Sequence, residues 1–277
     1  MKMRLFLIAS VLIIAAGAYA DWAYVENLGA PPNTAAAEKQ PGINGSGTLL
    51  VYNSGGNLYL TQWSGGAWSA PSALPASINN GSSNATPCWN GNMLYYSSDR
   101  ADGEGGWDLW SSEWNGTTFA APTNLGPGLN TTANETSPAL NPAGDTLYFR
   151  KGTDIFYATK SGGPWSNVQG TGIGTGRPAG YIDGTLYFSD DRAGGEGGLD
   201  IWLAVGSGSS FSAAVNLGTD INTSNDELGG SWTTDKRWMH FSSDRPGGEG
   251  GYDLYRGRFT MTAVKAASLG KIKATFE

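Results

Sequence analysis

A motif that occurs three times limits what this chain can fold into more than any other feature. It consists of a loop rich in glycine and acidic residues that leads into an apolar run, and its copies are SSDRADGEGGWDLW (97–110), SDDRAGGEGGLDIW (189–202) and SSDRPGGEGGYDLY (242–255). Each copy follows a short apolar run: MLYY, TLYF or WMHF. Two further segments keep both apolar runs but join them by a short turn: TLLVYNSGGNLYL (48–60) and TLYFRKGTDIFYA (146–158). The chain therefore contains five copies of one structural unit.

The spacing of the copies indicates what this unit is. Equivalent positions are separated by 44, 53, 39 and 53 residues, at Leu50, Leu94, Leu147, Leu186 and Met239. An average period of about 47 residues with short apolar runs fits a four-stranded propeller blade better than a helical solenoid. Each unit has an inner strand a, strands b and c on either side of the loop, and an outer strand d. The predicted blades, here called blades 1 to 5, cover about 34–75, 76–126, 127–172, 173–218 and 219–260.

The two ends of the repeat region predict how the ring closes. Strand d carries phrases such as FAAPTNLG (119–126), and blade 5 lacks this phrase, whereas residues 21–29, DWAYVENLG, supply it. An outer strand donated by the N-terminal segment closes the ring and removes an exposed sheet edge. We therefore predict an all-β, five-bladed β-propeller. A sixth, degenerate blade is the alternative, but no gap between the copies is long enough to hold one.

The composition supports an all-β chain and excludes other classes. The 277 residues include 42 Gly and 13 Pro, while only 15% are charged and 12% are aromatic. Charged residues are too few for a coiled coil or helical bundle, and apolar and aromatic residues are too many for a disordered chain. The formal charge of −7 argues against a nucleic-acid partner, because neutralising phosphates needs clustered Lys and Arg. The single cysteine, Cys88, excludes an intramolecular disulfide.

The first twenty residues have the anatomy of a secretory signal peptide. Lys2 and Arg4 precede a short apolar stretch, and small residues at 18–20 provide a cleavage site. This stretch is shorter than the roughly 20 residues that a membrane span requires, and no later stretch is apolar enough. We expect a secreted, periplasmic or cell-surface protein that is a monomer without a transmembrane segment after cleavage. The C-terminal tail, 261–277, lies outside the repeat and is interpreted as packing on the propeller, or else as a sorting or docking peptide.

The repeated phrase resembles that of a known family. LYFSSDRxGGxGGxDLW, preceded by NLGxxIN…E..P, is similar to the WD40-like propeller repeat of TolB-type periplasmic proteins and of propeller regions attached to OmpA-type envelope proteins. The resemblance covers roughly residues 30–258 in five units, fewer than the six blades that TolB implies. It implies a scaffold in the bacterial envelope that binds other proteins or cell-wall components, usually without catalysis.

The strand order places the candidate binding residues on one face. The b–c loops and the d–a crossovers share the same side of the ring, here called the upper face, and loops on a rigid scaffold supply most binding groups. The candidates are Arg100, Glu104, Trp107, Asp108, Glu135, Arg192, Glu196, Asp226, Glu227, Arg245, Glu249 and Tyr252. We expect this face to be mainly acidic, with three regularly placed arginines. The short turns of blades 1 and 3 should leave low points on its rim, which frame a groove for a protein or a glycan.

The same motif also has a structural interpretation. Its Asp can cap backbone N–H groups, its Arg can bridge to the next blade, and its glycines allow positive φ and close approach. Calcium is a further alternative, with Asp99, Glu104 and Asp108 as candidate ligands, because carboxylates and loop carbonyls supply hard oxygen atoms. The spacing differs from that of an EF-hand, and we expect no cofactor.

Signals for catalysis are few. The only histidine, His240, lies on a predicted strand, so that the chain offers no Ser-His-Asp triad, Cys-His pair or zinc site. The remaining catalytic alternative is a glycoside hydrolase that uses carboxylates at the channel, drawn from Glu38, Glu135, Asp226 and Glu227. The sequence favours a non-catalytic module that binds an envelope or extracellular protein, or a glycan, through its upper face.

Overall fold

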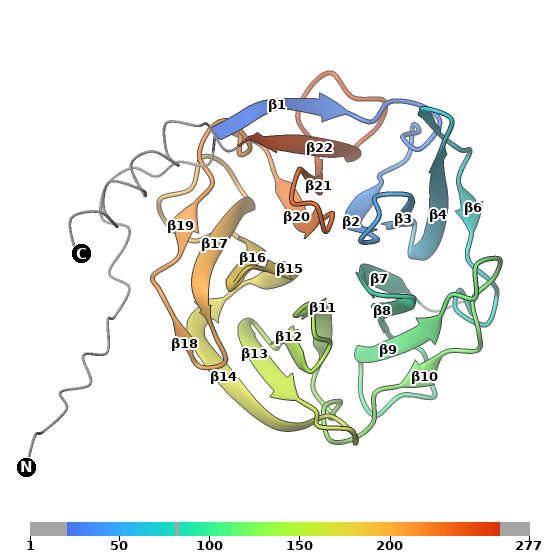
Figure 1. The fold of residues 1–277 in the computed structure, drawn as a ribbon, viewed down its shortest axis with the longest axis vertical. Coiled ribbons are helices and arrows are strands. Elements are labelled where there is room, and N and C mark those ends of the chain that lie inside the picture. Colours follow the sequence, from blue (N-terminus) through green and yellow to red (C-terminus); the bar gives the residue numbers. More distant parts are fainter. Residues whose placement is uncertain (1–20, 81–82, 261–277) are drawn as a thin grey trace, which may run out of the picture.

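The computed structural model describes residues 21–80 and 83–260, which form five antiparallel sheets arranged in a ring (Figure 1). The predicted signal peptide, 1–20, and the predicted tail, 261–277, lie outside the described residues. The chain is thus a five-bladed β-propeller, as the repeat predicts.

Each sheet is one blade and runs from an inner strand at the channel to an outer strand at the rim (Figure 1). Blade 1 consists of β2 (Lys39–Ile43), β3 (Leu49–Ser54), β4 (Asn57–Ser64), β5 (Ala67–Trp68) and β6 (Ser72–Ala73). Blade 2 consists of β7 (Asn84–Asn90), β8 (Met93–Ser98), β9 (Asp108–Glu113) and β10 (Thr123–Asn124). Blade 3 consists of β11 (Glu135–Leu140), β12 (Thr146–Lys151), β13 (Asp154–Thr159) and β14 (Ser166–Thr175).

The last two blades follow the same plan. Blade 4 consists of β15 (Arg177–Ile182), β16 (Thr185–Asp190), β17 (Asp200–Ser207), β18 (Ser210–Phe211) and β19 (Val215–Asn216). Blade 5 consists of β20 (Glu227–Trp232), β21 (Trp238–Ser243), β22 (Asp253–Thr260) and β1 (Asp21–Asn27). The two ends of the described chain therefore meet in one sheet, where β1 pairs antiparallel with β22. This pairing confirms the predicted closure by the N-terminal strand.

The core lies between the blades. Five clusters of buried apolar side chains each join residues of two neighbouring blades, as where Val51 and Leu60 of blade 1 pack against Leu94 and Trp110 of blade 2. Both faces of strand b are covered in this way, so its central residues are largely buried in every blade, and the repeated aromatic residues serve packing between blades. The inner strands contact one another in cyclic order and surround a central channel.

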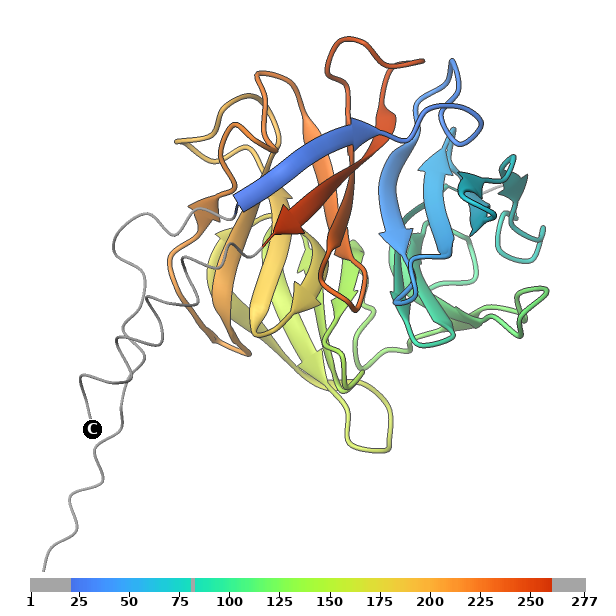
Figure 2. The same cartoon turned by 45° about the horizontal axis from the view of Figure 1, so that its top comes forward.

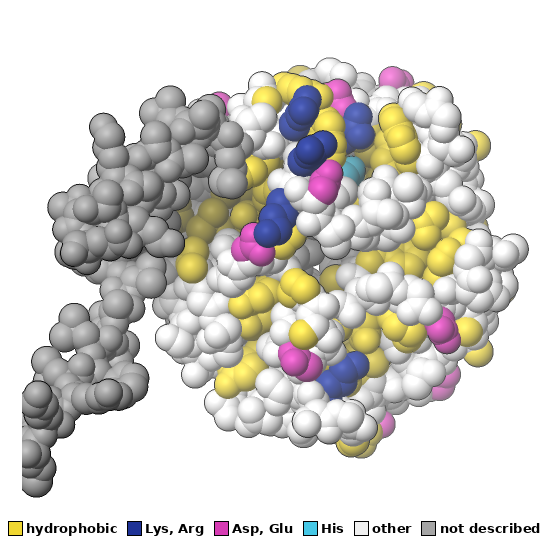
Figure 3. Space-filling model, in the orientation of Figure 1, with side chains coloured by type: hydrophobic (Ala, Val, Ile, Leu, Met, Phe, Trp, Pro, Cys, Tyr) yellow, Lys and Arg dark blue, Asp and Glu magenta, His cyan; other side chains and the backbone are white. Residues whose placement is uncertain are grey.

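The upper and lower faces of the ring carry different segments. The long b–c loops lie on the upper side, and Figure 2 shows the loop of blade 5, in red, rising there. Figure 3 views the ring from the lower face, where Lys and Arg gather over blade 5; Lys236 and Arg256 are ion-paired with Asp183 and Glu26. The lower mouth of the channel is a hollow of about 160 Å³ bordered by Trp89 and Tyr181. Within residues 21–80 and 83–260, no helix is long and apolar enough to cross a membrane.

Candidate functional site

The three long loops of the upper face are held by one buried aspartate each. Asp108, Asp200 and Asp253 are 1% exposed, and their Oδ2 atoms accept hydrogen bonds from the backbone N–H groups of the loop glutamates. The distances are 2.7 Å from Glu196 and 3.0 Å from Glu249. A Cβ atom at the glycine directly before the glutamate of each loop (Gly103, Gly195, Gly248) would overlap this carboxylate. The glycine and the aspartate of the motif therefore form one packing unit.

The three arginines of the motif also have partners within the scaffold. Arg100 donates to the carbonyl oxygen of Ser77 at 3.2 Å, Arg192 to that of Thr175 at 2.7 Å, and Arg245 to that of Ile221 at 2.6 Å. Ser77 and Ile221 lie in the crossover that precedes the blade of the arginine, and Thr175 ends β14, directly before that crossover. Each guanidinium also lies over an aromatic ring of its own blade, as Arg100 does over Trp110 at 4.5 Å. The arginines therefore bridge toward the preceding blade, and not to the next one as the structural interpretation expects; their role in ligand binding stays a prediction.

The glutamates of the crossovers are buried and hydrogen-bonded within their own loops. Glu38, Glu135 and Glu227 are at most 1% exposed, and each accepts hydrogen bonds from the backbone N–H and the hydroxyl of the threonine four residues earlier. Desolvation raises the pKa of Glu38 above its ordinary value. Asp226 accepts from the backbone N–H of Leu199 at 2.8 Å and from the Tyr252 hydroxyl at 2.6 Å. Burial and this contact with Asp226 raise the pKa of Tyr252 far above that of a free tyrosine.

The remaining candidate residues of the upper face are the exposed loop glutamates and Trp107, which is hydrogen-bonded through its backbone. Glu104, Glu196 and Glu249 are exposed at the loop tips. Trp107 is half-buried, and its backbone N–H and C=O are bonded to Asn134 and Glu135 of blade 3. The loop of blade 2 is therefore attached to the next blade by its backbone, and the glutamate side chains of the three long loops face solvent.

The calcium candidates do not converge on one point. Asp99 accepts a hydrogen bond from the backbone of Ser83, Glu104 is exposed, and Asp108 is buried. Within the described residues, no group of three or more His, Cys, Asp or Glu side chains is placed to hold a metal ion. The Oδ1 atom of Asp108 has no hydrogen-bond partner, and the same holds for the equivalent atoms of Asp200 and Asp253.

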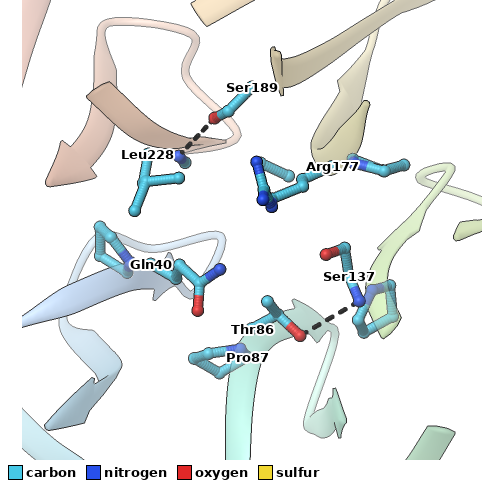
Figure 4. A pocket seen from close by; sticks show the side chains of 12 residues that line it. Gln40, Thr86, Pro87, Ser137, Arg177, Ser189 and Leu228 are labelled. Carbon is cyan, nitrogen blue, oxygen red and sulfur yellow. Dashed lines mark hydrogen bonds between the residues drawn. The ribbon is translucent and has the colours of Figure 1, made fainter. Parts of the chain in front are cut away.

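The channel is shaped by a bulge at the same point of every inner strand. The register shifts once in β2, β7, β11, β15 and β20. Four of these strands place Pro beside a polar residue that faces the channel, and Figure 4 shows Gln40 and Arg177 pointing into it from opposite sides. Gln40, Thr86 and Ser137 adopt left-handed φ angles between 52° and 59°, a backbone conformation with a steric cost for residues other than glycine.

A serine on strand b satisfies the freed N–H group of the next bulge. Ser97 accepts from the backbone of Ser137 at 3.1 Å, and Ser242 accepts from that of Gln40 at 3.1 Å. Ser189 accepts from the backbone of Gly229 at 3.0 Å (Figure 4). Because these serines occupy the same position of the repeat, they form one recurrent device of the scaffold.

Blade 3 breaks this rule. The residue equivalent to Ser97, Ser189 and Ser242 is Arg150, and the next inner strand begins with a second arginine, Arg177. Both line a hollow of about 340 Å³ at the upper mouth of the channel, together with Trp107 and six polar residues: Gln40, Thr86, Ser97, Asn134, Thr136 and Ser137. They also line an adjoining hollow of about 190 Å³ between blades 3 and 4.

The two arginines are the positive groups of this mouth. Burial and the neighbouring Arg177 guanidinium lower the pKa of Arg150 below its ordinary value. The Nε atom of Arg150 is buried without a hydrogen-bond partner. Sequence reasoning missed both residues, although a signal was present: each is a long cationic side chain at a repeat position that is uncharged in the other blades.

Comparison with known proteins reveals similarity in fold. No family model and no curated protein matches the sequence. A TolB-like protein from Agrobacterium tumefaciens matches in structure with a TM-score of 0.51 and 16% identity, over 86% of this chain and 90% of that one. An α-L-arabinofuranosidase from Podospora anserina in complex with cellotriose matches with a TM-score of 0.55 and 12% identity, over 86% and 96%. The catalytic domain of an α-L-arabinofuranosidase from Coprinopsis cinerea matches with a TM-score of 0.56 and 9% identity, over 87% and 98%.

These neighbours include both TolB-like and glycoside hydrolase propellers, so the likeness alone does not distinguish a binding role from a hydrolytic one. The chain is a β-propeller similar in fold to a TolB-like protein and to α-L-arabinofuranosidases.

Proposed function

We propose that this protein is a non-catalytic, secreted or envelope-located propeller that binds a glycan at the upper mouth of its channel. The observation that carries the proposal is the composition of the 340 Å³ hollow. Its walls offer amide and hydroxyl groups from Gln40, Thr86, Asn134 and other residues, together with the indole of Trp107. Sugars present hydroxyl groups that pair with such side chains and C–H faces that stack on aromatic rings.

The position of this hollow agrees with the low rim expected from the sequence. Blade 3 has only the short turn around Gly152 where blades 2, 4 and 5 carry long loops, and Gly152 itself lines the hollow. An extended ligand could therefore enter across blade 3 and reach the channel mouth. Export of the protein, inferred from residues 1–20, would place it among extracellular or envelope glycans.

The hydrolase alternative requires a pair of carboxyl groups about 5–10 Å apart in an open pocket. Among the described residues, no Asp or Glu lines the channel hollow or the hollows at its two mouths. Asp190 and Asp191 line the adjoining hollow between blades 3 and 4, and Asp190 is ion-paired with Arg192. The four carboxylates considered for this role are engaged by backbone, threonine or tyrosine groups of the loops. This arrangement supports binding over hydrolysis.

The proposal is tested by screening the purified protein on a glycan array and then assaying each bound oligosaccharide for hydrolysis. We expect binding without release of new reducing ends. The Trp107→Ala variant should weaken binding by roughly tenfold, the typical loss when an aromatic anchor is removed. Tyr24→Ala serves as the matched control, because Tyr24 is an exposed aromatic residue on the outer strand β1. Cleavage of a bound glycan, or an array without any ligand, would overturn the proposal.

A further inference from the structure

We propose that Arg150 and Arg177 bind the carboxylate of an acidic saccharide at the upper mouth of the channel. The inference rests on the proposed glycan-binding function and names the class of glycan. Its starting point is that two departures from the repeat meet at one place, on strand b of blade 3 and on the inner strand of blade 4.

The two guanidinium groups have no ionic partner within the described part of the chain. No ion pair joins Arg150 or Arg177 to a carboxylate, although seven ion pairs occur elsewhere in these residues. The nearby carboxylate of Asp190 is already engaged, because its Oδ2 atom accepts from Arg192 at 2.6 Å and from Thr175 at 2.9 Å. Acidic residues outnumber basic ones in this protein, whose formal charge is −7, so two neighbouring arginines without an ionic partner are unexpected.

This pair has a cost for the free protein. Two like charges repel each other, and the buried Nε of Arg150 lacks an acceptor. Serine at this position would bring neither penalty, as Ser97, Ser189 and Ser242 show in the other blades. An anion between the guanidinium groups would remove both penalties, since a carboxylate accepts several N–H groups at once.

The surroundings favour a saccharide as the carrier of that carboxylate. Both arginines line the two adjoining hollows, which open beside the short turn at Gly152 and Thr153. The smaller hollow also contains Asp190 and Asp191, whereas the larger one contains no acidic residue, so the carboxylate of the ligand is placed in the larger hollow. The larger hollow combines hydroxyl and amide side chains with one aromatic ring, Trp107, and its walls contain no Leu, Ile, Val, Met or Phe. A peptide normally anchors through apolar side chains in pockets or by adding to a strand edge, whereas a sugar is held by hydrogen bonds and one stacking contact.

The decisive experiment compares carboxylate-bearing oligosaccharides with their methyl esters. Binding of tri-galacturonate, and of a panel of other uronate oligosaccharides, is measured by calorimetry together with the corresponding neutral methyl esters. We expect at least one acid to bind roughly 10- to 100-fold more tightly than its ester, the difference typical of charge-assisted hydrogen bonds. Its affinity should also fall with added salt.

Two variants connect the preference to the arginines. Arg150→Ser introduces the residue found at this position in three other blades, and Arg177→Gln introduces the residue found in blade 1. Each should reduce the affinity for the acid by about tenfold or more and leave that for the ester within about twofold. Arg258→Ser, an exposed arginine of β22, is the control and should bind as the unchanged protein does. Thermal unfolding shows that each variant is folded, and Arg150→Ser should match or exceed the parent in stability.

The possible outcomes separate this inference from the function on which it rests. Equal binding of acid and ester, or an acid preference that survives both arginine variants, would overturn the inference and leave glycan binding intact. No binding of any oligosaccharide would overturn both. Arginine-dependent binding of a peptide with a free C-terminal carboxylate, in place of any saccharide, would refute the saccharide class.

Discussion

Two boundaries between blades use equivalent positions of the repeat: the boundary between blades 2 and 3, and the boundary between blades 3 and 4. They differ in whether the polar side chain on strand b has a hydrogen-bond partner within the protein. At the first boundary Ser97 accepts the N–H of Ser137, and Asn130 brackets the backbone of Leu109 with two hydrogen bonds. At the second boundary Arg150 replaces the serine, and its Nε has no partner.

The difference separates scaffold from candidate site. Residues that recur, such as the asparagine that also brackets strand c in blades 1, 4 and 5, are paired with the protein itself. Arg150, which departs from the repeat, leaves its Nε atom without a partner. Departures are therefore the better guide to function in this ring, because most recurrent polar groups are already used by the scaffold; the Oδ1 atoms of Asp108, Asp200 and Asp253 are the exception among the loop residues.

The largest effect is expected from removing a recurrent buried charge. Glu227 accepts hydrogen bonds from Thr223, Ser243 and Arg245, so Glu227→Ala should cost about 3 kcal/mol by leaving these donors and the Arg245 charge unpaired. Urea unfolding measures the loss, and Glu249→Ala, at an exposed loop tip, is the control with less than about 0.5 kcal/mol. If the two variants are equally stable, the separation of recurrent scaffold from solvent-facing rim is wrong.

A slightly smaller loss should follow from a methyl group in the long loop. In Gly248→Ala the new Cβ would overlap the Asp253 carboxylate and push the loop of blade 5 away, at a cost of about 2 kcal/mol. Gly163→Ala in blade 3 is the matched control, because a Cβ there meets no atom within 4 Å. The comparison by thermal unfolding fails if Gly163→Ala is the more damaging of the two.

His240, which is buried on β21 of blade 5, tests whether the interior of another blade tolerates a charge as the Arg150 position of blade 3 does. Burial and the nearby Arg256 lower the pKa of His240 to about 3, so the folded protein holds it neutral. The unfolded chain binds a proton near pH 6.5, and stability is therefore complete above that pH and declines as the pH falls toward 3. Between pH 7 and pH 5 the His240 contribution to the free energy of unfolding should drop by about 2 kcal/mol. Urea titrations at both pH values should show a smaller drop in His240→Phe; an identical drop would exclude this histidine as the cause.

The smallest effect concerns calcium at the long loops. The unpaired Oδ1 atoms of Asp108, Asp200 and Asp253 occur in each of the three loops, and water is a sufficient partner for such buried groups. We expect that adding calcium or a chelator leaves the melting temperature unchanged within about 1 °C, because a ligand that does not bind cannot stabilise the fold. A calcium-dependent rise that disappears in Asp108→Asn would instead make these loops metal sites and move function to the recurrent positions.

The repeat made the fold predictable from local information. The spacing of the apolar runs sets five blades, and the NLG phrase at residues 21–29 indicates the closing strand, because strand length and alternation follow from neighbouring residues. The same reasoning identified the residue types of the upper face. It could not tell which of these groups already have hydrogen-bond partners within the protein. Arg100 donates to the carbonyl oxygen of Ser77, and the backbone N–H of Glu38 donates to the carbonyl oxygen of Tyr252, more than 200 positions away in the sequence.

The candidate site emerged only from the folded ring. Arg150 and Arg177 are 27 positions apart and belong to different blades, and no periodicity in the sequence connects them. Their shared hollow exists because the inner strands converge on the channel and because blade 3 has a short turn where its neighbours have loops. The sequence by itself determined the blades, their number and the closure of the ring, which depend on local pattern. Only the tertiary structure decided which charges are paired and which remain free to bind, because pairing depends on contacts between distant residues.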